Sequence, residues 1–209
     1  MLVRDIMRSP AVAVSPDTTL GEAYRVMREK SIRHLPVLEA ERLTGVVTDR
    51  DLRLATSALA PHPFPPGSRV AEVMSSNPLT ADPGDPVEDA ARRMRERKIG
   101  CLPVLRDGRV VGIITGLDLL DALLALTGVS KPSGRLEVSL PDRPGELSRL
   151  TSFLDHRDLP VHSILMYPEK QETVRTVLRV GSMEIRMLAE DLRRADFEVV
   201  WPLEKPWPR

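Results

Sequence analysis

His34-Leu35-Pro36-Val37, followed by Gly45-Val46-Val47-Thr48-Asp49-Arg50-Asp51-Leu52, is a phrase that this chain contains twice. The second copy lies 67 residues further on and reads Cys101-Leu102-Pro103-Val104, then Gly112-Ile113-Ile114-Thr115-Gly116-Leu117-Asp118-Leu119. The same offset relates Val3 to Val70 and Met27 to Met94, with no gap between the copies. A repeat of this length indicates one structural unit used twice, so it decides the architecture.

Each copy is predicted to fold as strand, helix, strand, strand and helix. In the first copy, apolar residues at helical spacing predict a helix over 20–30. Two strands over 34–38 and 43–47 are joined by a stretch short enough for a hairpin. Thr48 is expected to begin a second helix that runs to about Leu59. One copy of about 60 residues buries little surface alone, so two copies are expected to share a core.

A different pattern follows a linker at 128–134. Its expected elements follow the order βαββαβ, with strands over 135–140, 161–167, 173–180 and 197–201. Residues 142–147 lead into one helix, which runs to about Asp155, and the other helix covers 183–194. This order is the split βαβ arrangement, an antiparallel sheet with two helices on one face. The chain is therefore predicted to be an α+β protein with domains at 1–64, 65–128 and 135–202.

Composition narrows the classes of function. The chain has 209 residues, 30 basic and 30 acidic side chains and a formal net charge of zero. Proteins that bind nucleic acids or membrane surfaces usually carry a basic excess, so neither partner is expected. Cys101 is the single cysteine, which leaves no intrachain disulfide. The charged N-terminus and the lack of a long apolar run predict a cytoplasmic protein.

The repeats resemble a tandem pair of CBS domains, often called a Bateman module, in which the two copies pack as a pseudo-twofold pair. The residues that carry the resemblance are the Leu-Pro-Val strand, the Gly-x-x-Thr-x-x-Asp junction and the leading Asp5-Ile6-Met7 and Glu72-Val73-Met74. The C-terminal segment resembles a ferredoxin-like ACT domain through Asp142-x-Pro144-Gly145-x-Leu147. The combined order resembles AcuB-type proteins, a family named for acetoin utilisation.

Thr48/Asp51 and Thr115/Asp118 can be interpreted in two ways. A Thr with an acid three residues later is close to a capping box at a helix start. The same geometry lets a carboxylate accept both ribose hydroxyls, while the Thr hydroxyl and free amides hold a phosphate. One copy alone favours capping, and the repeated Leu-Pro-Val context favours a ligand.

The resemblance to CBS pairs implies an adenosine-type regulatory ligand: AMP, ADP, ATP or S-adenosylmethionine. The Asp would contact the ribose, the Thr would lie near the phosphate, and Val12 and Leu79 would border the base. The expected binding residues are Val12, Arg33, His34, Pro36, Thr48, Arg50, Asp51, Leu79, Gly100, Cys101, Pro103, Thr115 and Asp118.

The two copies differ in charge. The first carries Arg33, His34 and Arg50, where the second has Gly100, Cys101 and Leu117. Arginine binds two phosphate oxygens at once, so the cleft that receives these groups is expected to prefer a more phosphorylated ligand. The alternative is that the two arginines are solvated surface charges and that His34 packs or caps. Cys101 lies in a predicted strand and is expected in the core.

The C-terminal motif also has two interpretations. In ACT domains this junction often binds an amino acid, which would involve Asp142, Pro144, Gly145 and Leu147. The structural alternative is a Pro in the first turn of a helix and a Gly at a sharp turn. The histidines are scattered, so no metal site is expected, and no common catalytic motif is present.

These observations predict a non-catalytic regulatory protein rather than an enzyme. Its CBS pair would sense an adenine nucleotide or another adenosine compound, and its ACT-like domain would add dimerisation or a second small ligand. A homodimer is expected, and a regulated enzyme is left open as a partner. The alternative function is an assembly module that binds a partner protein and leaves its nucleotide clefts empty.

Overall fold

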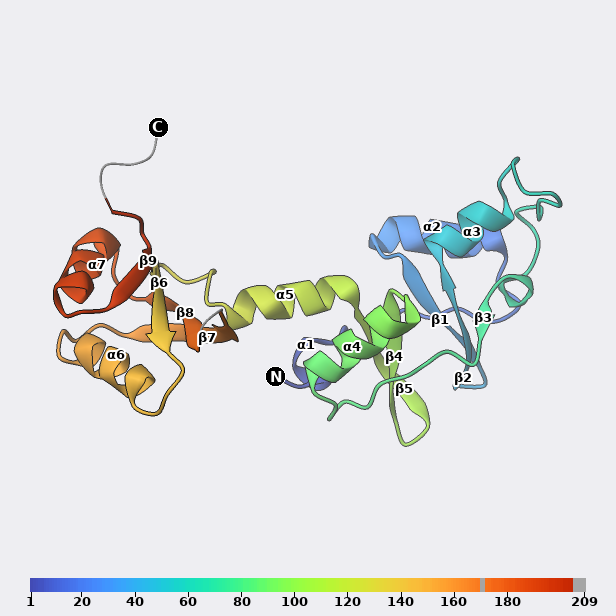
Figure 1. The fold of residues 1–209 in the computed structure, drawn as a ribbon. Coiled ribbons are helices and arrows are strands. Elements are labelled where there is room, and N and C mark those ends of the chain that lie inside the picture. Colours follow the sequence, from blue (N-terminus) through green and yellow to red (C-terminus); the bar gives the residue numbers. More distant parts are fainter. Residues whose placement is uncertain (170–171, 205–209) are drawn as a thin grey trace. The chain divides into compact units, whose positions relative to one another are not determined.

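The computed structural model describes residues 1–169 and 172–204. Its chain divides into two compact units of mixed α/β structure, Met1–Ala122 and Leu123–Arg209. Each unit has its own hydrophobic core, and Figure 1 shows the helices and strands that form them.

The first copy of the repeat forms a helix, a hairpin and a second helix. The strand predicted before the first helix does not form, since residues 11–14 contain only an isolated bridge at Val14. Its elements are α2 (Leu20–Lys30), β1 (His34–Glu39), β2 (Arg42–Thr48) and α3 (Asp49–Ala55). Helix α2 has the predicted bounds and buries Leu20, Ala23 and Met27 against the hairpin. Helices α2 and α3 lie side by side along β1 and β2, as Figure 1 shows. The copy therefore has one helical layer on one small sheet.

Helix α3 is shorter than the sequence predicted. It ends at Ala55, and the prediction that it continues to Leu59 is wrong. The hydroxyl of Thr56 donates to the Leu52 carbonyl at 2.8 Å, where the helix stops. Leu59 is 95% exposed, so a further helical turn would have had no core to bury it.

The second copy repeats this layout. Its elements are η1 (Val70–Glu72), β3 (Ser75–Ser76), α4 (Val87–Arg97), β4 (Cys101–Arg106), β5 (Arg109–Thr115) and α5 (Gly116–Leu126), which continues into the second unit. The register matches too: His34 lies opposite Thr48 in the first hairpin, and Cys101 lies opposite Thr115 in the second. The repeat in sequence is therefore a repeat in structure.

Each copy begins with a segment that packs on the other copy. We call residues 3–9 the first leader, which includes α1 (Val3–Ile6), and residues 70–76 the second leader. The matching backbone bonds are Val3 N–H to the Asp85 carbonyl at 2.9 Å and Val70 N–H to the Thr18 carbonyl at 2.8 Å. Val3 lies in the core of the second copy, and Val70 lies in that of the first. The leaders are thus exchanged between the copies.

The ends of the leaders also extend the opposite hairpins. Arg8 pairs with Ile113 of β5, and Ser75 pairs with Val46 of β2. Arg8 and Ser75 are 67 residues apart, as are Val46 and Ile113, so the two pairings are equivalent. Val46 and Ile113 then meet Cys101 in a small core that both copies supply. This shared core places the two Thr/Asp junctions in one unit.

The second unit has the predicted βαββαβ order. Its elements are β6 (Gly134–Pro141), α6 (Glu146–Asp155), β7 (Val161–Pro168), β8 (Thr173–Val180), α7 (Ile185–Arg194) and β9 (Glu198–Trp201). The antiparallel sheet has the order β7-β8-β6-β9. Leucines of α6 and α7 pack on one face of this sheet with Leu136, Val138 and Leu178. The predicted elements are all present, with ends that differ by at most two residues.

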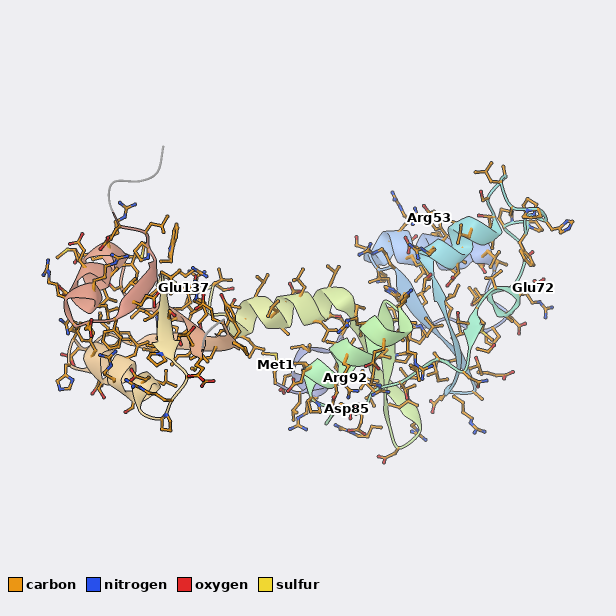
Figure 2. All side chains as sticks on the ribbon, in the orientation of Figure 1. Met1, Arg53, Glu72, Asp85, Arg92 and Glu137 are labelled. Atoms are coloured by element: carbon orange, nitrogen blue, oxygen red, sulfur yellow. The ribbon has the colours of Figure 1, made fainter. Side chains whose placement is uncertain are left out.

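The other face of this sheet carries a buried carboxylate. Glu137, which is labelled in Figure 2, is only 8% exposed. It accepts from Arg175 at 3.0 Å and from the Tyr167 hydroxyl at 3.2 Å, and it pairs with Arg135 at 2.6 Å. Burial raises the pKa of Glu137. The bonds from Arg135, Arg175 and Tyr167 together lower it by more than burial raises it, so the pKa lies below its usual value. The carboxylate is charged and fully engaged.

Candidate ligand-binding site

The first Thr/Asp junction lies where β2 ends and α3 begins. Thr48 is the N-cap residue, and its backbone N–H and hydroxyl donate to Oδ2 of Asp51 at 2.9 and 2.8 Å. The Asp51 N–H returns a bond to the Thr48 hydroxyl at 3.2 Å. The Asp49 N–H donates to the Arg33 carbonyl at 3.0 Å, which ties the helix start to β1. The junction is therefore a capping box with a carboxylate fixed at a helix N-terminus.

The second junction has the same geometry between β5 and α5. Thr115 donates from its backbone and its hydroxyl to Oδ2 of Asp118 at 2.8 and 2.7 Å. The Gly116 N–H donates to the Gly100 carbonyl at 3.1 Å, as the bond from Asp49 to Arg33 does in the first copy. The capping interpretation therefore holds in both copies. The capping box uses only Oδ2 of each aspartate, so the second oxygen, Oδ1, is available for another partner.

The two aspartates differ at that second oxygen. Asp118 is 4% exposed, and its Oδ1 accepts from Nε of Arg8 at 2.9 Å. Asp51 is half-buried, and within residues 1–169 and 172–204 its Oδ1 accepts no hydrogen bond. Arg8 is not among the residues that the sequence predicts for the site. The repeat aligns Arg8 with Ser75, which shows that the two leaders differ but not which junction each one reaches.

His34 lies between the two junctions. Its ring packs on Gly100, where an added Cβ would lie 2.6 Å from Nε2. Burial lowers the pKa of His34, and Arg33 lowers it further, whereas Asp49, Asp51 and Asp118 act in the opposite direction. The net direction is down, which favours the neutral ring. Both candidate carboxylates therefore act on one histidine.

Cys101 occupies the position of His34 in the second copy. It is buried, as expected from the sequence. Burial raises the pKa of its thiol to about 12, and the charge of Asp51 acts in the same direction. The cysteine is therefore an uncharged packing residue beside the first junction.

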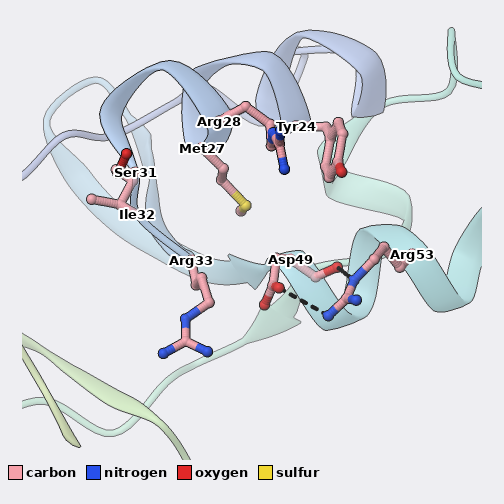
Figure 3. A pocket seen from close by; sticks show the side chains of 8 residues that line it. All are labelled: Tyr24, Met27, Arg28, Ser31, Ile32, Arg33, Asp49 and Arg53. Carbon is pink, nitrogen blue, oxygen red and sulfur yellow. Dashed lines mark hydrogen bonds and ion pairs between the residues drawn. The ribbon is translucent and has the colours of Figure 1, made fainter. Parts of the chain in front are cut away.

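Arg33 lines a hollow between α2 and α3, with a volume of about 450 Å³ (Figure 3). Arg28, Arg53 and Asp49 also line it, and Arg53 donates to the Asp49 carboxylate at 3.0 Å. Neither Thr48 nor Asp51 is among its lining residues. The structure thus places Arg33 among basic side chains in a hollow that Asp51 does not line. Arg50 is exposed in the first turn of α3.

The remaining predicted residues fall into two groups. Pro36 and Pro103 are buried in β1 and β4, opposite Val46 and Ile113 of the shared core. Val12 and Leu79 are 37% and 38% exposed. The prolines therefore shape the strands, while Val12 and Leu79 present apolar surface.

A second hollow lies at the β6–α6 junction, with a volume of about 330 Å³. Its lining includes Arg143, Glu146 and Arg149, and none of the predicted Asp142, Pro144, Gly145 and Leu147. Glu146 is 8% exposed and accepts from Arg143 at 2.8 Å and from Arg149 at 3.2 Å. The bond from Arg143 is the largest effect on the pKa of Glu146, which is lowered. Asp142, Pro144 and Gly145 form the turn before α6, with Gly145 at φ 94°, and Leu147 lies in the first turn of the helix.

Two further classes of feature, metal centres and membrane-spanning helices, do not occur in the part of the chain that the structure describes. It contains no group of three or more His, Cys, Asp or Glu side chains arranged to hold a metal ion. It also contains no helix with the length and apolar character needed to cross a membrane.

The fold and the duplicated junction define a class of protein. The sequence pattern of the CBS domain matches residues 3–57 and 70–125, and the chain belongs to the CBS-domain family. A CBS domain-containing protein of Dictyostelium discoideum is 38% identical over 137 residues, which cover 59% of this chain and 92% of that protein. YhcV of Bacillus subtilis, also a CBS domain-containing protein, is 35% identical over 56% of this chain and 81% of its own length.

Solved structures show the same pair. An acetoin utilization protein (AcuB) from Vibrio cholerae is 33% identical, with a TM-score of 0.53 over 63% of this chain and 98% of that one. The CBS domain pair of protein MJ0100, in complex with 5′-methylthioadenosine and S-adenosyl-L-methionine, is 28% identical, with a TM-score of 0.54 over 63% and 98%. CBSX2 in complex with AMP is 31% identical, with a TM-score of 0.50 over 59% and 96%.

Proposed function

We propose that this chain is a non-catalytic, cytoplasmic regulatory protein whose CBS pair binds an adenine nucleotide or another adenosine compound. The observation that carries the proposal is the free Oδ1 of Asp51. A carboxylate that is fixed at a helix start by Thr48, and that keeps one oxygen open, can accept the two hydroxyls of a ribose.

The solved relatives support the same class of ligand. Two CBS structures that resemble this chain were solved with adenosine compounds, one with AMP and one with 5′-methylthioadenosine and S-adenosyl-L-methionine. AMP, ADP, ATP and S-adenosylmethionine are therefore the candidates. Val12 and Leu79 would border the base, because both present apolar surface.

The proposal assigns a different role to each part of the chain. CBS repeats at 1–64 and 65–128 would sense the ligand, and the unit at 135–202 would act as an ACT-like domain for homodimerisation or a second small ligand. The βαββαβ order and the hollow beside Glu146 support the ACT-like assignment. A bound ligand can regulate only if it binds two states of the protein with unequal affinity.

Titration calorimetry with AMP, ADP, ATP and S-adenosylmethionine tests the proposal, with equilibrium dialysis as a second measurement. We expect saturable binding of at least one compound, and an Asp51→Asn variant that binds it roughly 10- to 150-fold more weakly, the equivalent of about 1.5–3 kcal/mol. Glu22→Gln is the matched control, because Glu22 makes the same capping box with Thr19 in α2. No binding of any of the four compounds would leave the assembly module as the better function.

A further inference from the structure

Arg8 reaches the second junction because the first leader is exchanged. Its backbone exchanges hydrogen bonds with Ile113 at 2.9 and 3.0 Å, two residues before Thr115 ends β5. From this anchored position its Nε donates to Oδ1 of Asp118 at 2.9 Å. The pairing of Ser75 with Val46 is the equivalent contact in the first copy. A serine side chain is too short to bridge to Asp51 as Arg8 does to Asp118.

The contact with Arg8 changes what Asp118 can bind. Its Oδ2 already accepts two bonds from Thr115, and its Oδ1 accepts a charged donor. A bond from a guanidinium to a carboxylate is stronger than one from a neutral hydroxyl. Asp118 is also 4% exposed, and a buried carboxylate without a partner is costly. A ribose would have to displace Arg8 from the oxygen that it needs.

We propose that Arg8 is a specificity-determining residue that closes the Asp118 cleft to adenosine, so that each chain binds one adenosine ligand, at Asp51. This inference rests on the proposed function and adds to it which of the two clefts is open. Residues 8 and 75 then decide the occupancy: an arginine closes the facing cleft, and a serine leaves it open.

The exchange of these two residues tests the proposal. The variants are Arg8→Ser, Ser75→Arg and the double variant, and AMP and S-adenosylmethionine are the probes in calorimetry on the full chain. We expect one site per chain in the wild type, two in Arg8→Ser, none in Ser75→Arg and one in the double variant. Adding Asp118→Asn to Arg8→Ser should remove the second site again and return the count to one site per chain. Both exchanged side chains are exposed, which favours folding of the variants.

The outcomes separate the two proposals. Two equal sites in the wild type, or an unchanged number of sites in Arg8→Ser, would overturn the role of Arg8 and leave the adenosine function standing. No binding of either probe to any variant would overturn both. Arg8→Gln is a second variant for the same measurement, since it keeps a long polar side chain without the charge. Circular dichroism melting curves confirm that each variant is folded.

Discussion

His34 lies against Gly100 so closely that a Cβ on Gly100 would come within 2.6 Å of Nε2 of the ring. The two residues belong to different copies of the repeat, and the contact joins the copies beside both candidate carboxylates. A glycine at position 100 therefore leaves room for the His34 ring. The histidine could not keep its position beside any larger residue there.

Gly100→Ala is expected to destabilise the protein by about 1–3 kcal/mol, because the added methyl forces the His34 ring away from its packed position. Urea unfolding measures the change. Gly67→Ala is the control, since a Cβ on Gly67 meets no atom within 4 Å. The double variant with His34→Ala should recover part of the loss. Equal stability of Gly100→Ala and Gly67→Ala would show that the contact is dispensable.

Stability is expected to fall in mild acid through His34. Its pKa is lowered in the folded protein, so the unfolded chain takes up the proton first as the pH drops through about 6.5. The free energy of unfolding therefore decreases below that pH and levels off below the folded pKa. Unfolding curves at several pH values between about 7.5 and 5 should show a smaller decrease for His34→Gln than for the wild type. His62→Gln, at an exposed linker residue, should follow the wild type; parallel curves for all three proteins would rule out His34 as the cause.

Cys101 is expected to resist alkylation in the folded protein. Its pKa is raised to about 12, and its side chain is buried, so little thiolate is present or accessible at pH 8. An unfolded cysteine has a pKa of about 8.5 and should react at least roughly a hundredfold faster with iodoacetamide. Mass spectrometry in native buffer and in urea measures both rates. Rapid labelling of the native protein would mean that the shared core is not closed around this residue.

Arg33 and Arg50 are expected to recognise phosphate if they belong to the occupied cleft. The double variant Arg33→Gln/Arg50→Gln should then bind AMP more weakly, by roughly tenfold or more, and adenosine almost unchanged. Added salt should narrow the difference, because both side chains are exposed. The control is Arg97→Gln/Arg106→Gln, which removes two exposed arginines from the second copy. An equal loss for adenosine and AMP would favour the interpretation as surface charges.

The sequence predicts most of the local structure because the relevant signals are local. The apolar spacing from Leu20 to Met27 and the hairpin strands depend on neighbouring residues, and both are confirmed. The predicted end of α3 was wrong, since the exposure of Leu59 depends on packing that no local pattern encodes. The capping boxes of Thr48 and Thr115 were visible from their spacing alone.

The pairing of Arg8 with Asp118 could not be predicted in the same way. The two residues are 110 positions apart, and their contact depends on the exchange of the leaders. Spacing within one copy cannot show which copy a leader packs on.

The exchanged leaders also explain why a covalent link between the copies matters. Two separate, identical copies could complete each other in the same way, but both of their carboxylates would then face the same leader residue. Joining the copies in one polypeptide keeps the reciprocal packing and lets the two leaders carry different side chains, Arg8 and Ser75. The covalent link therefore allows the two Thr/Asp junctions, which would be identical in a symmetric pair of separate copies, to be surrounded by different side chains.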